Sequence, residues 1–190
     1  MDGAAQDRWV FGYGSLMWRP GFPFIDRRRA TLHGRRRAFC IYSVHHRGTY
    51  ARPGLVLGLA PGGSTRGVAY RVAAADWDQV YAYLREREQP TETYFEAWRD
   101  VRIGDTHRSS QMNGACPQSA LVFLSDPHHP QWAGNLTLDQ QAALIDGATG
   151  LSGRNIDYLR DLVLHLREEG VSDHGMERLL GMVETLEAAA

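Results

Sequence analysis

The stretch "WVFGYGSLMW", residues 9–18, joins an apolar run to a glycine-rich corner. Val10 and Phe11 favour a strand, and the following Gly-Tyr-Gly-Ser, residues 12–15, predicts a sharp exit from it. Successive backbone N–H groups in such a corner can bind an anion or a carbonyl oxygen, and glycine lets a substrate approach closely. An ordinary tight turn is the alternative interpretation of the same residues.

The spacing of the two glycines argues against two familiar sites. A dinucleotide-binding fingerprint needs a third glycine at position 17, where Met17 stands. A nucleophile elbow needs a glycine two residues before the serine, where Tyr13 stands. Ser15 is therefore not expected to be the nucleophile of such an elbow.

Composition favours a folded domain. The chain has 190 residues, 43% of them hydrophobic, so we expect one domain over residues 1–190 with residues 1–8 as a flexible N-terminal extension. A formal net charge of -1 argues against a nucleic-acid partner. With neither a signal peptide nor an apolar stretch of roughly 20 residues, we expect a cytoplasmic location and no membrane partner.

Several cofactor classes are disfavoured by what the chain lacks. All 21 basic residues are arginine, which excludes a Walker-type phosphate loop and a lysine Schiff base. Cys40 and Cys116 are too few for a disulfide framework or a four-cysteine zinc site. Histidines occur as adjacent pairs, at 45–46 and 128–129, rather than at helical metal-ligand spacing. We therefore expect neither a metal nor a cofactor.

The order of the predicted elements indicates an α+β fold. Strands are expected first, separated by turn signals such as "APGGS" at 60–64, and helices close the chain. Short strands with few crossover helices favour a mixed or closed sheet, that is, a small curled sheet or barrel. The expected strands are 9–12, 30–33, 37–43, 55–59, 67–72, 94–103 and 120–124, and the expected helices are 76–90, 137–150, 152–170 and 172–187.

The helix expected at 76–90 carries the sharpest chemical signal. Successive helical residues lie about 100° apart, so Trp77, Val80, Tyr81 and Leu84 form one apolar stripe. Glu88 falls on the centre of this stripe, whereas Glu86 points to the opposite side. Burial and the negative end of the helix dipole both raise a carboxyl pKa, as a general base near neutral pH requires. The alternative is that Glu88 turns into solvent or pairs with a neighbouring arginine.

A second unusual segment, "SGRN" at residues 152–155, precedes the third helix. Ser152 or Asn155 is expected to cap that helix. Arg154 is a candidate partner for a carboxylate, and Tyr158 begins an apolar stripe with a hydroxyl that needs a partner when it is buried.

Six segments in order resemble the ChaC-like γ-glutamylcyclotransferases, which degrade glutathione. They are "VFGYGSLMW" (10–18), "HRG" (46–48), "PGLVLGL" (53–59), "GVAYRV" (67–72), "YLRERE" (83–88) and "SGRNIDYL" (152–159). Each segment is weak alone, but the ordered set spans nearly the whole chain.

The resemblance implies a small mixed β-barrel with packed helices and a set of site residues. The "YGSL" loop, which comprises Tyr13, Gly14, Ser15 and Leu16, would hold the γ-glutamyl group through backbone amides. The family's catalytic glutamate ends the helix segment that matches Glu88, and Tyr158 matches a tyrosine near the substrate. Arg47 and Arg154 are candidates for binding the glycine carboxylate of glutathione.

Two departures from the family pattern stand out. Gln79 occupies the place of a second acidic residue that some members carry nine residues before the catalytic one. "QPTETY", residues 89–94, replaces a glycine-rich turn, which leaves a gating role for this region open.

The implied reaction is cyclisation of the γ-glutamyl group of glutathione to 5-oxoproline with release of Cys-Gly. It needs no cofactor, and glutathione is the expected small-molecule partner. Two alternatives are the same reaction on other γ-glutamyl amines or dipeptides, and a non-catalytic regulator or ligand-binding module linked to cation transport. The sequence leaves a monomer and a dimer equally open.

Overall fold

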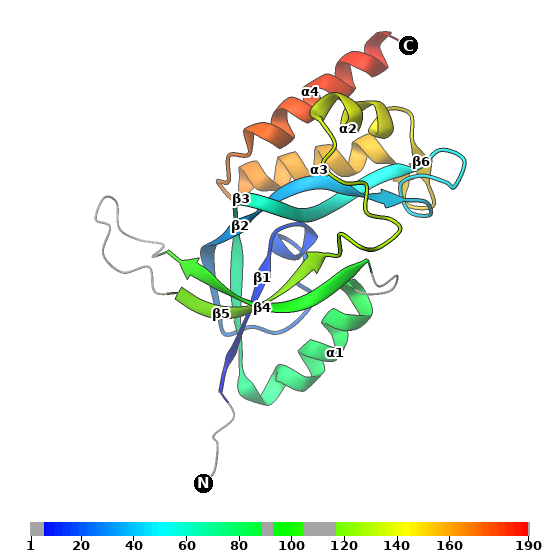
Figure 1. The fold of residues 1–190 in the computed structure, drawn as a ribbon. Helices are drawn as coiled ribbons and strands as arrows, with labels where there is room; N and C mark the ends of the chain where they lie inside the picture. The colour runs from blue at the N-terminus through cyan, green and yellow to red at the C-terminus, as the bar shows by residue number, and fades with distance from the viewer. Residues whose placement is uncertain (1–5, 89–92, 105–116, 190) are drawn as a thin grey trace. The chain divides into compact units, whose positions relative to one another are not determined.

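The computed structural model describes residues 6–88, 93–104 and 117–189, and its chain divides into two compact units. The first unit comprises Met1–Arg36 and Pro61–Leu124, and the second comprises Arg37–Ala60 and Ser125–Ala190. Figure 1 shows the two long strands β2 (Asp26–Ser43) and β3 (Gly54–Val72). Each of them contributes residues to both units. Of the N-terminal extension predicted at 1–8, residues 1–5 lie outside the described chain, and Arg8 is the first residue of β1.

The strands form a closed barrel in the order β1-β3-β2-β4-β5. β1 (Arg8–Gly12) pairs antiparallel with β3 and parallel with β5 (Pro117–Ser125), and β4 (Tyr94–Ile103) pairs antiparallel with β2. β1 therefore has a partner on each edge, and its residues Val10 and Phe11 are both fully buried. The expectation of a mixed, closed sheet is confirmed.

Two expected turns are absent, and this corrects the predicted strand boundaries. β2 continues through Gly34, where φ is 79°, and β3 continues through Gly62 and Gly63, where φ is 88° and 70°. Glycine adopts positive φ without a steric cost, so these residues bend a strand where the sequence pattern predicted a break. His33 Nδ1 and Ser64 Oγ, 2.9 Å apart, join the two strands beside these glycines.

The described residues of the first unit contain one α-helix, α1 (Trp77–Glu88), which continues directly from the 3-10 turn η2 (Ala74–Asp76). Its predicted apolar face is confirmed because Trp77, Val80 and Leu84 are buried. The Tyr81 hydroxyl donates a 2.7 Å hydrogen bond to Glu96 on β4. These contacts hold α1 against the barrel of its own unit.

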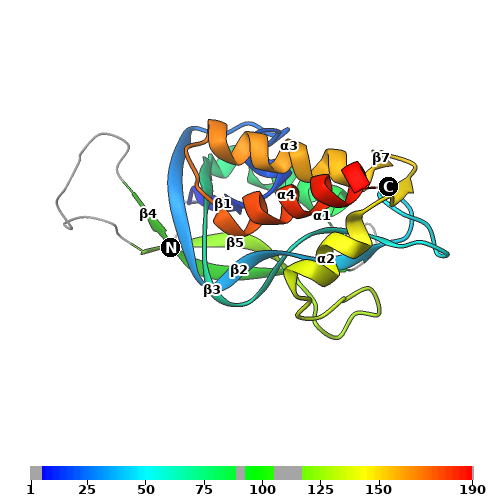
Figure 2. The same cartoon turned by 90° about the horizontal axis from the view of Figure 1, so that it is seen from above.

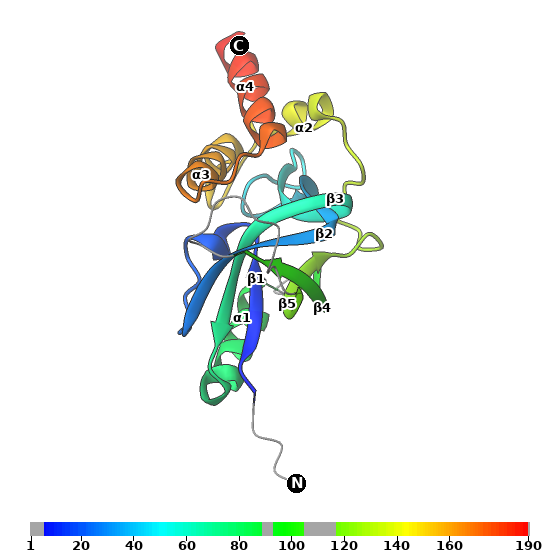
Figure 3. The same cartoon turned by 90° about the vertical axis from the view of Figure 1, so that its left-hand side faces the viewer.

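The second unit contains three helices, α2 (Leu138–Ile145), α3 (Asn155–Glu168) and α4 (His174–Ala189), and the short pair β6 (Thr149–Gly150) and β7 (Gly153–Arg154). α4 packs against both α2 and α3, as Figures 2 and 3 show. Thr137 caps α2, since its side chain accepts the Gln140 N–H and the Gln140 side chain accepts the Thr137 N–H. No helix in the described part of the chain is long and apolar enough to span a membrane.

The predicted capping of α3 by Ser152 or Asn155 is wrong. Arg154 occupies the N-cap position and makes no side-chain cap bond. Asn155 is instead fully buried, and its side-chain amide accepts the Leu55 N–H at 2.6 Å and donates to the Leu55 carbonyl at 2.7 Å. The two buried hydrogen bonds between the Asn155 amide and the Leu55 backbone stabilise the fold more than one cap bond at the helix surface would.

Candidate active site

The glycine-rich corner leads from β1 into η1 (Ser15–Met17), a single 3-10 turn. Its first hydrogen bond runs from the Met17 N–H to the Gly14 carbonyl, at 2.9 Å. The N–H groups of Gly14, Ser15 and Leu16 come before this bond, so the turn itself gives them no acceptor. Gly14 and Ser15 are partly exposed. At Gly14 and Ser15 the corner therefore combines partial exposure with N–H groups that the turn does not use, whereas Leu16 is buried.

Two tyrosine hydroxyl groups hold this corner in place. Tyr13 donates a 2.9 Å hydrogen bond to the Phe123 carbonyl, so its ring is an anchor inside the unit. Tyr70 donates to the carbonyls of Leu16, at 3.0 Å, and Met17, at 2.7 Å. The sequence reasoning missed Tyr70. The signal for it is a tyrosine on the buried face of the "GVAYRV" strand, because a buried hydroxyl needs a hydrogen-bond partner.

Gly12 serves the packing of the corner. A Cβ atom added at position 12 would lie 2.9 Å from the Leu16 Cβ and 3.2 Å from the Leu16 carbonyl carbon. The close packing of the turn is therefore sufficient to explain the glycine at position 12. Close approach of a substrate is not required to explain it.

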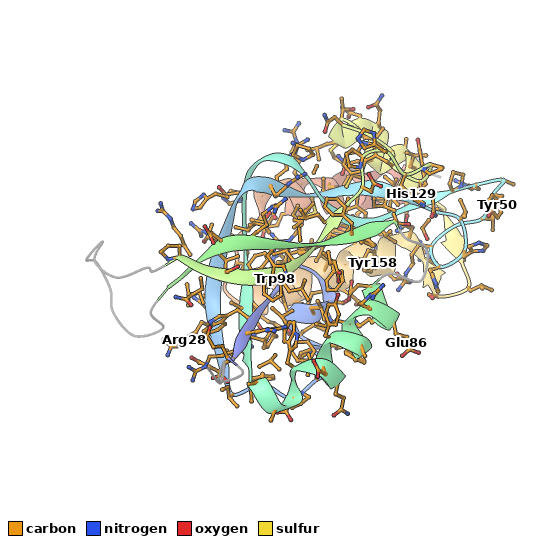
Figure 4. The ribbon with its side chains drawn as sticks, turned by 60° about the horizontal axis from the view of Figure 1, so that its bottom comes forward. Arg28, Tyr50, Glu86, Trp98, His129 and Tyr158 are labelled. Atoms are coloured by element: carbon orange, nitrogen blue, oxygen red, sulfur yellow. The ribbon has the colours of Figure 1, made fainter. Side chains whose placement is uncertain are left out.

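Glu88 is the last residue of α1, and its side chain is 20% exposed. Burial raises the pKa of the Glu88 carboxyl above its ordinary value, and the adjacent Arg87 guanidinium opposes this rise to a lesser extent. The predicted direction of the pKa shift is confirmed. Glu86, two residues earlier, is exposed and points away from the helix into solvent (Figure 4).

The alternative expectation for Glu88, pairing with a neighbouring arginine, is also realised. Arg87 Nε lies 3.2 Å from Glu88 Oε1. The same guanidinium donates through Nη2 to the Ser15 hydroxyl at 3.0 Å. One arginine thus contacts both the predicted base and the predicted substrate loop. The sequence reasoning did not single out Arg87, although it stands beside Glu88 in the quoted segment "YLRERE".

The other predicted binding residues lie in the second unit. The Arg47 guanidinium lies over the Tyr158 ring, 5.3 Å from its centre, and Phe39 contacts the same ring edge-on. Arg47 Nη1 donates to the carbonyls of Ser152, at 2.6 Å, and Arg154, at 3.2 Å. The Arg154 guanidinium pairs with Glu187. The structure therefore gathers Arg47, Arg154 and Tyr158 in one unit, and their contact with a substrate stays a prediction.

The remaining candidates from the sequence are the two cysteines, the segment at 89–94 and a possible metal site. Cys40 is buried in the core. Cys116 and residues 89–92 of the "QPTETY" segment lie outside the described residues. Among the residues that are described, no three histidine, cysteine, aspartate or glutamate side chains gather closely enough to hold a metal ion.

Comparisons with known proteins converge on one group. The sequence model of the family described as "ChaC-like protein" matches residues 8–186. The glutathione-specific γ-glutamylcyclotransferase of Escherichia coli K12 is 37% identical over 178 residues, which cover 94% of this chain and 73% of that protein. The mouse glutathione-specific γ-glutamylcyclotransferase 1 is 32% identical over 189 residues, which cover 97% of this chain and 82% of that protein.

Solved structures agree with the sequence comparisons. A crystal structure of the yeast γ-glutamyl cyclotransferase specific to glutathione superposes with a TM-score of 0.81 at 26% identity, covering 95% of this chain and 99% of that one. YkqA from Bacillus subtilis has a TM-score of 0.56 at 21% identity and shares the fold.

Proposed function

The chain belongs to the ChaC-like protein family, and from this premise we propose that it converts glutathione to 5-oxoproline and Cys-Gly with Glu88 as the general base and acid. The observation that carries the catalytic assignment is the partly buried Glu88 carboxyl, whose pKa is raised and which Arg87 ties to the amide-bearing corner. The substrate is a small molecule, and we place the reaction in the cytoplasm, where glutathione keeps thiols reduced.

The reaction is an intramolecular aminolysis. Glu88 accepts a proton from the α-ammonium group of the γ-glutamyl residue, which frees the nitrogen lone pair. That nitrogen attacks the γ-carbonyl carbon and closes a five-membered ring. When the tetrahedral intermediate collapses, the C–N bond to cysteine breaks and Glu88 returns the proton to the leaving nitrogen. Glu88 also carries the second proton of the attacking nitrogen to the leaving amine, so the products are the neutral lactam and the Cys-Gly ammonium. All atoms of glutathione appear in the two products.

A single carboxyl group suffices for these proton transfers because nucleophile and electrophile belong to one molecule. Correct orientation of tethered groups lowers a barrier by about 7–11 kcal/mol in favourable cases. A base whose pKa lies closer to neutrality than that of an ordinary glutamate takes the ammonium proton more readily. The burial of Glu88 supplies this property.

The corner supplies the second catalytic contribution. In this proposal the N–H groups of Gly14, Ser15 and Leu16 donate to the α-carboxylate of the substrate or to the developing oxyanion. Removing one oxyanion donor costs about 3–4 kcal/mol in other enzymes. Tyr13 contributes through its backbone, since its hydroxyl already binds the Phe123 carbonyl.

Arg47 is the residue that we propose for recognition of the glycine carboxylate in the Cys-Gly half of the substrate. The Arg47 guanidinium carries the positive charge that would attract the glycine carboxylate, and Tyr158 supports it from below. Arg154 is the weaker candidate because Glu187 already pairs with it.

The test is incubation of the purified protein with millimolar glutathione, with 5-oxoproline and Cys-Gly quantified by mass spectrometry. Equal amounts of both products are expected, together with slower release of 5-oxoproline from γ-Glu-Ala and γ-glutamyl-lysine. Faster turnover of either of those would assign the chain to a different γ-glutamyl substrate. Absence of product from all three would reject an enzymatic function and favour a binding module.

A further inference from the structure

We propose that Arg87 is a positioning residue for this reaction, because its guanidinium joins the Ser15 hydroxyl to the Glu88 carboxylate and so fixes the amide-bearing corner relative to the base. The inference rests on the proposed function for its catalytic consequence. Its structural core, the link between the corner and Glu88, can be tested without substrate.

The contacts of Arg87 involve all three guanidinium nitrogens. Nε faces Glu88 and Nη2 donates to Ser15. Nη1 donates to the Pro20 carbonyl at 3.1 Å and to the Tyr83 hydroxyl at 2.9 Å, and it also binds the Arg19 carbonyl. A planar guanidinium offers its donors in a fixed arrangement, so these contacts together set one orientation of the group. With its donors committed to protein acceptors, Arg87 organises the site rather than binding the substrate.

The backbone next to these carbonyls is shaped for the same network. Gly21 has a φ of 74°, and a Cβ atom added there would lie 2.1 Å from the Tyr83 hydroxyl oxygen. Any larger residue would push Tyr83 away from the loop that Arg87 holds. Phe22 contacts the Tyr83 ring at a centroid distance of 6.4 Å. The loop that follows η1 is thus packed onto the last turns of α1, and Arg87 lies at the centre of the contact.

The charge of Arg87 has a separate effect on Glu88. Among the described residues, Arg87 is the charged group that acts on the Glu88 pKa, and it opposes the rise that burial causes. The other groups of the network, the Ser15 and Tyr83 hydroxyls and the carbonyls of Arg19 and Pro20, carry no formal charge at neutral pH. Without the guanidinium, burial acts on Glu88 unopposed, so its pKa rises further.

Two substitutions separate the charge from the geometry. Arg87→Gln removes the charge and most donors, whereas Arg87→Lys keeps the charge but cannot reach Ser15, Pro20 and Glu88 together. Arg85→Gln is the matched control, because Arg85 is exposed on the same helix and its guanidinium lies over the Tyr81 ring, 5.9 Å from the ring centre.

The experiment measures the Glu88 pKa by carbon-13 NMR in the substrate-free protein, assigning the signal by its absence in Glu88→Gln, and then kcat and KM for glutathione. Arg87→Gln is expected to raise the Glu88 pKa and to lower kcat roughly ten- to a hundredfold. Arg87→Lys is expected to keep the pKa nearer that of the unsubstituted protein and still to lose kcat. Arg85→Gln is expected to change neither quantity.

A Glu88 pKa in Arg87→Gln equal to that of the unsubstituted protein overturns the proposal, whatever the activity. An unchanged kcat in both Arg87 variants overturns it as well. If Arg87→Gln does not fold, the kcat of Arg87→Lys decides in the same way. Failure of the proposed function gives a different result, because the unsubstituted protein then forms no 5-oxoproline while the NMR titration still reports the link between Arg87 and Glu88.

Discussion

The Arg87 guanidinium donates a 3.0 Å hydrogen bond to the Ser15 hydroxyl, across 72 positions of the chain. The same side chain lies against the Glu88 carboxylate. Backbone donors that suit a carboxylate or an oxyanion are thus tied to a carboxyl group that suits proton transfer. This contact supports the proposal that the glycine-rich corner and the end of α1 belong to one site.

Ser15 is predicted to position the loop and to take no part as a nucleophile. Ser15→Ala loses one partner of Arg87, so kcat should fall by no more than about tenfold, corresponding to the roughly 1 kcal/mol net value of a hydrogen bond. Loss of a true serine nucleophile costs about a millionfold. Steady-state kinetics distinguish the two outcomes, with Ser64→Ala, in the same unit, as the control for the substitution itself.

Gly21→Ala and Gly34→Ala form a matched pair in the first unit. Both glycines have positive φ, near 74° and 79°, but only at Gly21 would the new methyl group meet a neighbour, the Tyr83 hydroxyl. In both variants the alanine must adopt a left-handed backbone conformation, which should lower the free energy of unfolding by roughly 1–2 kcal/mol. In Gly21→Ala, overpacking against Tyr83 should lower the free energy of unfolding by about 1–3 kcal/mol more.

Denaturant unfolding of the two glycine variants provides the measurement, and kcat provides a second one. Gly21→Ala should also lower kcat because Tyr83 shares the Arg87 network. Equal losses of unfolding free energy would show that the contact with Tyr83 is not tight in solution.

The pKa of Glu88 predicts how stability changes with pH. Because the folded-state pKa is raised, the native state favours the protonated carboxyl, so this contribution to stability is full below the ordinary glutamate pKa and is lost as pH rises through the raised one. Glu88→Gln removes that dependence. The variant should therefore gain Tm relative to the unsubstituted protein as the pH rises from about 4 to 8. Scanning calorimetry across this range tests the sign, and a relative loss of Tm with rising pH would contradict it.

Arg47 is predicted to recognise the glycine carboxylate. Arg47→Gln should then raise KM for glutathione while leaving KM for γ-Glu-Cys, which lacks the glycine, nearly unchanged. Arg52→Gln is the control because Arg52 also braces a loop of the second unit, through the Asp146 carbonyl at 2.9 Å. A KM that rises equally for both substrates would assign Arg47 to loop structure alone.

Local sequence pattern predicts the individual helices and strands of this fold better than it predicts which of them are continuous and which of them pair. Periodicity places α1 and its buried Trp77, Val80 and Leu84, and it puts Glu88 on the same side. Glycines predict turns for good reason, but a positive φ also bends a continuous strand, as at Gly34 and Gly62. Only the pairing partners distinguish the two cases.

The residues that the pattern missed depend on distant partners. The sequence does not distinguish Arg87 from the other arginines, because its partners in the loop after η1 are far away in the chain. In the sequence Asn155 has the features of a helix cap, because its hydrogen-bond partner Leu55 is 100 positions away. Closure of the barrel likewise depends on the parallel pairing of β1 with β5, which joins Val10 to Leu121. None of these contacts leaves a local signal.

The central claim is that Glu88 carries the proton transfers, and kcat for glutathione in Glu88→Gln beside Glu86→Gln tests it most directly. The two substitutions are chemically identical and lie two residues apart, one at the partly buried helix end and one on its exposed side. The account predicts that Glu88→Gln stays folded and loses at least about a hundredfold in kcat, while Glu86→Gln retains nearly full activity. A folded Glu88→Gln variant with kcat near that of Glu86→Gln would contradict the account.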